Sequence, residues 1–166
     1  TAWLAQQPEI DGKQLGVFGI SLGGITGALA ATAEPRLRNV CLLMAGGDIA
    51  TAAWKSYQLA PLRAAWQAAG GTRESLIAHL KPVDPVTYGE NVHGRRILML
   101  AARYDKVVPV ECTQSLWRSF GKPRIIWMDC GHYSSARFIF FALTKVTRFF
   151  ANAQPARSAS PAAGKR

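Results

Sequence analysis

The sequence predicts an α/β fold built on a mostly parallel sheet of about four strands, with helices on both faces. Short apolar runs alternate along the chain with stretches of helix-forming residues. Each apolar run is continuous rather than alternating, which is typical of parallel strands that are buried on both sides. The predicted strands are residues 15–20, 40–44, 97–100 and 125–128.

Helices are expected after the first strand and after the last one. Residues 21–33 contain good helix formers and end at Glu34 and Pro35, a helix stop. Residues from about 135 to 150 place apolar side chains on one stripe, typical of a helix that packs on a sheet. Few cations flank this stripe, so packing on the sheet is favoured over binding to a membrane surface.

A long insert separates the second and third predicted strands. Residues 50–94 exceed what a simple crossover needs, and their apolar residues recur at roughly helical spacing. We expect two or three helices, which either form a cap over a functional site or pack on the sheet. The domain should extend over residues 1–150. Residues 151–166 are rich in Ala, Pro, Ser and basic residues, and we expect a disordered tail.

The composition limits the classes of partner. The formal net charge is +10, which could attract nucleic acid or an anionic membrane. The cations are scattered and form no dense run, so a basic surface without either partner is favoured. The longest apolar run, residues 97–102, is far shorter than the roughly 20 residues that span a bilayer.

The three cysteines predict neither a disulfide framework nor a metal site. Their number is odd and no Cys-x-x-Cys spacing occurs. Cys41 lies in an apolar strand, and we expect it to be a small core residue. Reduced thiols favour a cytoplasmic location.

The strongest functional signal is the pattern G-x-S-x-G at residues 19–23. It lies between a predicted strand and a predicted helix, where a nucleophile elbow exposes its serine on a sharp turn. Gly19 and Gly23 are expected to avoid clashes at this turn. Ser21 is the candidate nucleophile, and the Leu22 N–H is a candidate oxyanion donor at a helix N-terminus. A serine-capped turn or a phosphate-binding loop are the alternatives, which the strand–helix context disfavours.

A candidate acid and a candidate base follow the later strands. Asp105 comes just after the third strand, and His132 just after the fourth. The carboxyl ends of parallel strands share one edge, so Ser21, Asp105 and His132 are expected to converge as a catalytic triad. Asp48 follows the second strand and is a competing acid, whereas Asp129 is too close to His132 in sequence. Of the other histidines, His79 falls in the insert and His93 in a loop.

From the elbow to Phe150 the sequence resembles the C-terminal part of an α/β-hydrolase, near the dienelactone hydrolase and esterase branch. The resemblance rests on the elbow, on residues 105–109 and on the Gly131-His132 pair. It implies a serine esterase, lipase, thioesterase or peptidase that needs no cofactor or metal and acts on a small-molecule ester or acyl substrate. Dienelactone hydrolases have cysteine at the elbow, so Ser21 favours ester hydrolysis instead.

The sequence departs from this family before the elbow. Family members carry several strands and a second oxyanion donor there, whereas residues 1–12 alone precede the first predicted strand. We therefore expect a partial α/β-hydrolase fold in which residues 15–20 form an exposed, self-associating sheet edge. With the Leu22 donor alone, turnover should fall by about 10²–10³. A non-catalytic binding module is the alternative function.

Overall fold

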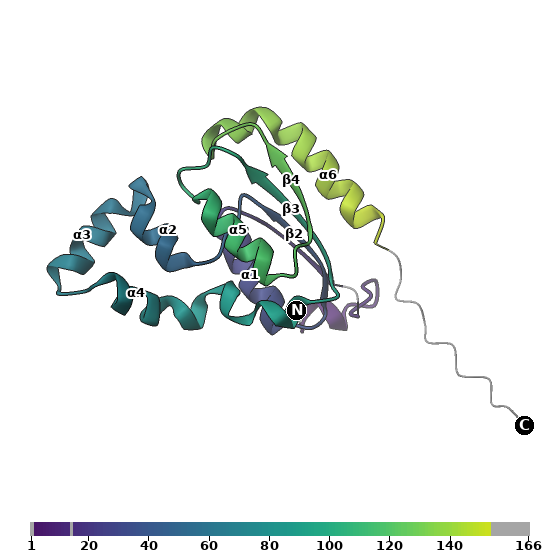
Figure 1. Cartoon of the computed structure of the whole chain (residues 1–166). Helices are drawn as coiled ribbons and strands as arrows, with labels where there is room; N and C mark the ends of the chain where they lie inside the picture. The colour runs from purple at the N-terminus through teal and green to yellow at the C-terminus, as the bar shows by residue number, and fades with distance from the viewer. Residues whose placement is uncertain (1, 14, 154–166) are drawn as a thin grey trace, which may run out of the picture.

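Four parallel strands form one sheet in the order β1-β2-β3-β4, as Figure 1 shows. The computed structural model describes residues 2–13 and 15–153. The pairing register runs from Phe18 to Cys41, from Cys41 to Leu98, and from Leu98 to Arg124. The carboxyl ends of all four strands therefore lie at the same end of the sheet, which we call its carboxyl edge. The predicted parallel sheet is confirmed. The strands are β1 (Leu15–Ile20), β2 (Leu37–Leu43), β3 (Arg96–Ala102) and β4 (Arg124–Met128).

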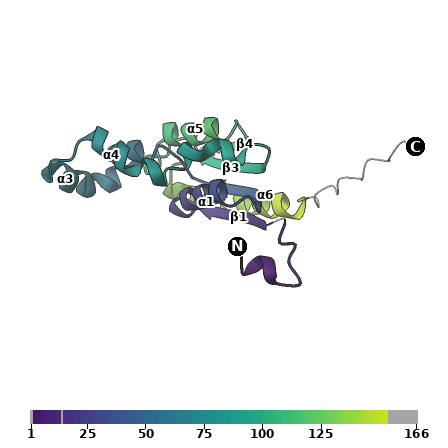
Figure 2. The same cartoon turned by 90° about the horizontal axis from the view of Figure 1, so that it is seen from below.

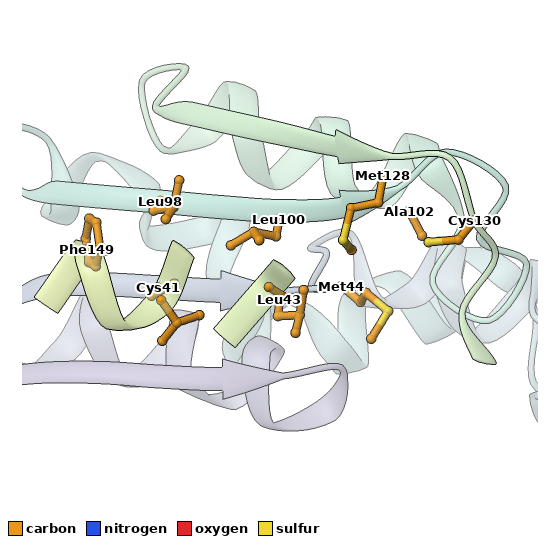
Figure 3. Packing of buried hydrophobic residues seen from close by; sticks show 11 residues of the cluster. Cys41, Leu43, Met44, Leu98, Leu100, Ala102, Met128, Cys130 and Phe149 are labelled. Atoms are coloured by element: carbon orange, nitrogen blue, oxygen red, sulfur yellow. The ribbon is translucent and has the colours of Figure 1, made fainter. Parts of the chain in front are cut away.

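One face of the sheet is covered by α6 (Ile139–Ala151), the last helix of the described chain. Its residues Ala142, Val146 and Phe149 recur every three or four positions, so they share one side of the helix. They pack on alternate residues of the inner strands, including Cys41 and Leu100 (Figure 3). The sulfur-containing side chains of Met44, Met128 and Cys130 close this core at the carboxyl edge.

The opposite face is covered by α1 (Leu22–Ala33) and α5 (Val110–Ser119). Ala28 and Ala31 of α1, with Leu116 of α5, meet the strand residues whose side chains point this way. Small residues on α1 let its backbone approach the sheet closely. A Cβ at Gly24 would lie 2.8 Å from the Cβ of Ala45. The inner strands β2 and β3 are thus buried on both faces, which explains their continuous apolar runs.

The insert forms a helical arm, which we define as residues 49–83. Figures 1 and 2 show that α3 and α4 project beyond the sheet instead of lying on either face. Neither α3 nor α4 contains a buried residue. The arm and the segment that returns to β3 comprise α2 (Ile49–Lys55), α3 (Ala60–Ala68), α4 (Arg73–Leu80) and the 3₁₀ segments η2 (Tyr57–Leu59), η3 (Lys81–Val83) and η4 (Pro85–Val92).

Two polar contacts anchor and shape the helical arm. Lys55 at the end of α2 forms an ion pair of 2.6 Å with Glu111 on α5. At the start of α4, the Thr72 hydroxyl accepts a bond from the Ser75 N–H, and the Ser75 hydroxyl accepts one from the Thr72 N–H. This reciprocal capping satisfies two donors of the first turn and ends the loop at Gly70-Gly71.

Sequence and structure differ at several boundaries. The final α-helix begins at Ile139 rather than near residue 135, because a 3₁₀ segment, η5 (Tyr133–Phe138), precedes it. A short 3₁₀ turn, η1 (Leu4–Gln6), lies before β1. The expected disordered tail falls largely outside the described residues, since α6 continues to Ala151 and the description ends at residue 153.

Strand β1 is an edge of the sheet formed by the described residues, where it pairs with β2 alone. Its side chains Phe18 and Ile20 are 38% and 40% exposed, although their register partners Cys41 and Leu43 are buried. No helix within residues 2–13 and 15–153 is long and apolar enough to cross a membrane.

Candidate active site

Ser21 occupies a strained turn between β1 and α1. Its backbone has φ 54° and ψ −118°, an unusual conformation for a residue with a side chain. The Ser21 N–H donates to the Leu43 carbonyl at 2.8 Å, while the Ser21 carbonyl accepts from the Ile25 N–H at 3.0 Å. The turn is therefore held by β2 on one side and by the first turn of α1 on the other.

The two glycines of the elbow have different roles. A Cβ at Gly19 would lie 2.1 Å from the Gly23 carbonyl oxygen, so a side chain there would displace the helix start. Apart from its chain neighbours and the backbone of its own helix, a Cβ at Gly23 would meet no described heavy atom within 4 Å. The expected steric need is thus correct for Gly19 and wrong for Gly23 in this structure, because the Gly23 Cβ position opens onto a side that no described residue covers.

His132 lies in the loop after β4 and reaches back to Ser21. The Ser21 hydroxyl is 2.9 Å from His132 Nε2, although 111 residues separate the two in sequence. The Gly131 N–H donates to the Ser134 hydroxyl at 2.8 Å, which fixes the turn that carries the imidazole. The His132 side chain is 10% exposed, so the ring is largely shielded from water while its Nε2 faces the elbow.

Asp105 lies on the other side of the imidazole. Its Oδ2 is 2.7 Å from His132 Nδ1, and its Oδ1 accepts the N–H groups of Val107 and Val108, each at 2.9 Å. The carboxylate side chain is 3% exposed. A carboxylate can only accept a hydrogen bond, so the proton of the neutral imidazole is favoured on Nδ1. In that tautomer Nε2 is free to accept the Ser21 hydroxyl proton.

The loops that carry Asp105 and His132 are joined by backbone hydrogen bonds. The Arg103 N–H donates to the Met128 carbonyl and the Tyr104 N–H to the Cys130 carbonyl, both at 3.0 Å. These bonds extend the pairing of β3 with β4 beyond the strands themselves. The distance between the acid and the imidazole is therefore set by the sheet rather than by flexible loops.

Leu22 begins α1 directly after Ser21. The N–H groups of a first helical turn have no partner within the helix, and the helix dipole places partial positive charge there. The Leu22 backbone thus presents a donor beside the Ser21 hydroxyl. Its side chain is 72% exposed, so the surface around the elbow is open in the described structure.

The competing carboxylates have other partners. Asp48 caps α2, where its side chain accepts the Thr51 N–H at 3.3 Å. Asp129 is exposed and forms an ion pair of 2.8 Å with Arg103. Neither contacts His132, so Asp105 is the carboxylate that the structure brings to the imidazole.

The remaining histidines and the cysteines lie apart from this cluster. His79 packs beside the Trp66 ring on the helical arm, and His93 Nε2 is 3.1 Å from the Ser119 carbonyl. All three cysteines are free and buried. Burial raises the pKa of the Cys41 thiol to about 12, and burial beside Asp48 raises the pKa of Cys112 to about 12. Such thiols are poor nucleophiles at neutral pH. The described residues contain no group of three or more His, Cys, Asp or Glu side chains that could hold a metal ion.

Sequence reasoning missed two contacts near the site. Asp84 is 9% exposed, and its carboxylate accepts the N–H groups of Asp48, Ile49 and Val86 at 3.1, 2.8 and 3.0 Å. It thereby ties the loop after β2 to the segment that returns from the helical arm. The Asp-Pro pair at 84–85, typical of a helix start, was the available signal.

The second missed contact joins the helical arm to the histidine loop. The Gln58 amide donates to the Tyr133 hydroxyl, and the Tyr133 ring packs edge-on against the His132 ring at 5.5 Å. The Tyr133 side chain is mostly exposed. An element far from the sheet thus reaches the residue next to the imidazole.

A sequence model of the X-Pro dipeptidyl-peptidase (S15) family matches residues 1–129. A comparison with curated protein sequences found no match. Among solved structures, the acylaminoacyl peptidase of Pyrococcus horikoshii superposes with a TM-score of 0.71 at 17% identity, over 96% of this chain and 27% of that one.

Two esterases show the same likeness of fold. The acetyl xylan esterase of Paenibacillus sp. R4 gives a TM-score of 0.69 at 15% identity, over 86% of this chain and 49% of that one. Acetyl xylan esterase 1 of Thermoanaerobacterium sp. gives a TM-score of 0.67 at 20% identity, over 90% of this chain and 50% of that one. The chain thus spans from about a quarter to half of these proteins, and its fold is that of a C-terminal part of an α/β-hydrolase.

Proposed function

We propose that this chain, which belongs to the X-Pro dipeptidyl-peptidase (S15) family through a model that covers most of its length, carries the catalytic triad of a serine hydrolase that cleaves carboxylic esters. The observation that carries the proposal is the hydrogen-bond chain from Ser21 through His132 to Asp105, with links of 2.9 and 2.7 Å. A nucleophile, a base and an orienting carboxylate at these distances are the groups that acyl transfer needs.

In the first half of the reaction Ser21 Oγ attacks the carbonyl carbon of the ester. The hydroxyl proton moves to His132 Nε2 as the new carbon–oxygen bond forms. Negative charge develops on the carbonyl oxygen, and the Leu22 N–H is placed to stabilise it at the start of α1. The bond to the leaving alkoxide then breaks, and His132 donates the proton to that alkoxide. The product of this half is an acyl group on Ser21.

In the second half a water molecule replaces the alcohol. His132 Nε2 accepts a proton from the water as the water oxygen attacks the acyl carbon. When the tetrahedral species collapses, His132 returns the proton to Ser21 Oγ and the carboxylic acid leaves. Asp105 orients the imidazole in both halves. Its Oδ1 is held by two backbone N–H groups, so its Oδ2 remains directed at the imidazolium that forms in each half.

The helical arm offers a surface for the substrate. Gln58 and Tyr133 meet beside His132, at the carboxyl edge of the sheet where ligands of parallel α/β proteins bind. We assign the arm to substrate binding and not to the chemical steps, because the side-chain hydrogen bonds found for Ser21, His132 and Asp105 in the described structure involve no residue of the arm.

A second candidate activity is the cleavage of a peptide bond after proline. The family match supports it, and the acylaminoacyl peptidase likeness agrees with an amide substrate. The same triad would serve, with His132 protonating an amine in place of an alkoxide. Parallel assays with p-nitrophenyl acetate and alanyl-prolyl p-nitroanilide distinguish the two activities by which chromogenic group is released.

The test of the mechanism is the Ser21→Ala variant in the ester assay. We expect turnover to fall by at least about 10³, because no other group replaces the nucleophile. Ser115→Ala on α5 removes a hydroxyl remote from the triad and is the matched control, expected to change turnover less than twofold. If the wild-type chain, correctly folded, neither hydrolyses an ester nor reacts with a serine-directed phosphonate, the non-catalytic binding module becomes the better description.

A further inference from the structure

A basic cavity lies at the end of the sheet opposite the triad. It has a volume of about 430 Å³ and is formed where β3 and β4 begin, beside the C-terminal turns of α6. Arg96 and Arg124 are the first residues of their strands, whereas Asp105 and His132 follow the ends of those strands. The cavity and the proposed catalytic site are therefore separated by the length of the sheet.

Four cations line this cavity: Arg96, Arg124, Lys145 and Arg148. The ion pairs found among the described residues involve none of them. No described carboxylate lines the cavity either. Like charges around a concave surface raise the local potential and attract anions.

Part of the cationic lining is already held in place. The Arg96 guanidinium lies 4.1 Å from the centre of the Phe149 ring, donates to the Phe149 carbonyl, and is 3.4 Å from Asn39 Oδ1. The Lys145 ammonium lies 5.0 Å from the Phe141 ring. Because these contacts restrict the side chains before any ligand binds, less conformational entropy is lost on binding.

The dipole of α6 explains the presence of only some of the four cations that line the cavity. Arg148 lies in the last turn of α6, where the helix dipole favours a cation. Arg96 also donates to a carbonyl of the last turn of α6, that of Phe149, whereas Arg124 begins the neighbouring strand β4 and has no such contact among those the structure shows. Arg96, Arg124 and Asn152 line the cavity from three separate chain segments.

We propose that this cavity binds a small multivalent oxyanion of the phosphate type. Guanidinium groups bind such anions through paired, charge-assisted hydrogen bonds, and two or more arginines at one cavity suit an anion with several charges. The ligand class covers both inorganic polyphosphate and the phosphate groups of a small phosphorylated molecule. The site is independent of the ester hydrolysis proposed above.

The test is calorimetric titration of the 166-residue chain with inorganic triphosphate at constant ionic strength. We expect saturable binding of one triphosphate per chain. The double variant R124A/R148A should weaken it at least about tenfold, since each lost charge-assisted contact is worth about a tenfold change or more in affinity. The double variant K81A/R118A removes the same charge from exposed positions outside the cavity and should weaken binding less than about twofold. Circular dichroism spectra check that both variants keep the fold.

Three results would overturn the assignment. One is the absence of saturable binding at millimolar triphosphate. Another is equal weakening by the two double variants, which would make net charge the cause. The third is tighter binding of duplex DNA or of phosphatidylserine vesicles than of triphosphate, lost in R124A/R148A, because the surface would then serve a macromolecule or a membrane.

Discussion

The sheet and the helical arm differ in how their residues are packed. In the sheet, Leu42, Met99 and Leu100 are among the largest fully buried side chains of the described chain. In the arm, α3 and α4 bury no residue at all, and side chains such as Leu62 are mostly exposed. The sheet is therefore a rigid frame, whereas the arm is attached mainly through α2 and through single polar contacts.

This difference separates two kinds of residue in the proposed active site. Ser21, Asp105 and His132 each follow a strand of the sheet, so their mutual distances depend on its packing. The arm reaches the same edge by the Gln58–Tyr133 contact. Changes in the sheet should therefore affect the chemical step and global stability, and changes in the arm should affect substrate binding with little effect on either.

The largest expected effect is that of Asp105→Asn. An asparagine keeps the shape of the side chain but favours the wrong imidazole tautomer and no longer stabilises the imidazolium. We expect kcat for p-nitrophenyl acetate to fall by about 10⁴, with a much smaller change in KM. Asp129→Asn removes the neighbouring exposed carboxylate and should leave kcat within about twofold. Comparable losses in the two variants would place the acid elsewhere.

A core substitution in the sheet should cost more stability than one in the arm. Leu100→Ala empties a fully buried position and is expected to lower the free energy of unfolding by about 2–5 kcal/mol. Leu62→Ala on α3 removes the same atoms from an exposed position and should change it by less than about 0.5 kcal/mol. Urea denaturation followed by circular dichroism measures both. Similar losses would show that the arm has a packed core of its own.

Asp84 links the two regions and should have an intermediate effect. Asp84→Ala leaves the partly buried N–H groups of Asp48, Ile49 and Val86 without their acceptor, so we expect the free energy of unfolding to fall by about 1–3 kcal/mol. Asp11 also accepts a backbone N–H, that of Lys13, but on the exposed surface. Asp11→Ala in the same urea experiment is the control and should cost less. An unchanged free energy of unfolding in Asp84→Ala would show that the loop after β2 does not depend on the hydrogen bonds to Asp84.

The smallest expected effect is in the arm contact itself. Gln58→Ala removes the donor to the Tyr133 hydroxyl, so we expect KM for a bulky acyl ester to rise by less than about tenfold while kcat stays within about twofold. Tyr57→Phe alters the neighbouring exposed side chain and should change neither constant. A fall in kcat without a change in KM would place Gln58 in the chemical step and remove the separation between sheet and arm.

The strands, the elbow and the convergence of Ser21, Asp105 and His132 were predictable from sequence, each for a physical reason. Continuous apolar runs mark strands that are covered on both faces, and a glycine two residues before Ser21 marks a turn with no room for a Cβ. Once the sheet is parallel, residues that follow its strands meet at one edge, so Asp105 and His132 could be placed together although 27 residues separate them.

Other features depend on contacts that no local pattern records. Nothing in the spacing of residues 133–138 distinguishes a 3₁₀ segment from the first turns of an α-helix. Asp84 resembles an ordinary turn residue, because its partners Asp48 and Ile49 are 36 and 35 residues away. The apolar spacing of residues 50–94 predicts helices but not the direction in which they project, which is determined by tertiary contacts.

The most direct test of the central claim is the reaction of the chain with a fluorophosphonate, followed by peptide mapping by mass spectrometry. The reagent phosphonylates a serine only where a base activates it. We predict one adduct, on Ser21, that is absent in Ser21→Ala and forms far more slowly in His132→Gln. An adduct on a different serine, or labelling of Ser21 at an unchanged rate in His132→Gln, would contradict a triad formed by Ser21, His132 and Asp105.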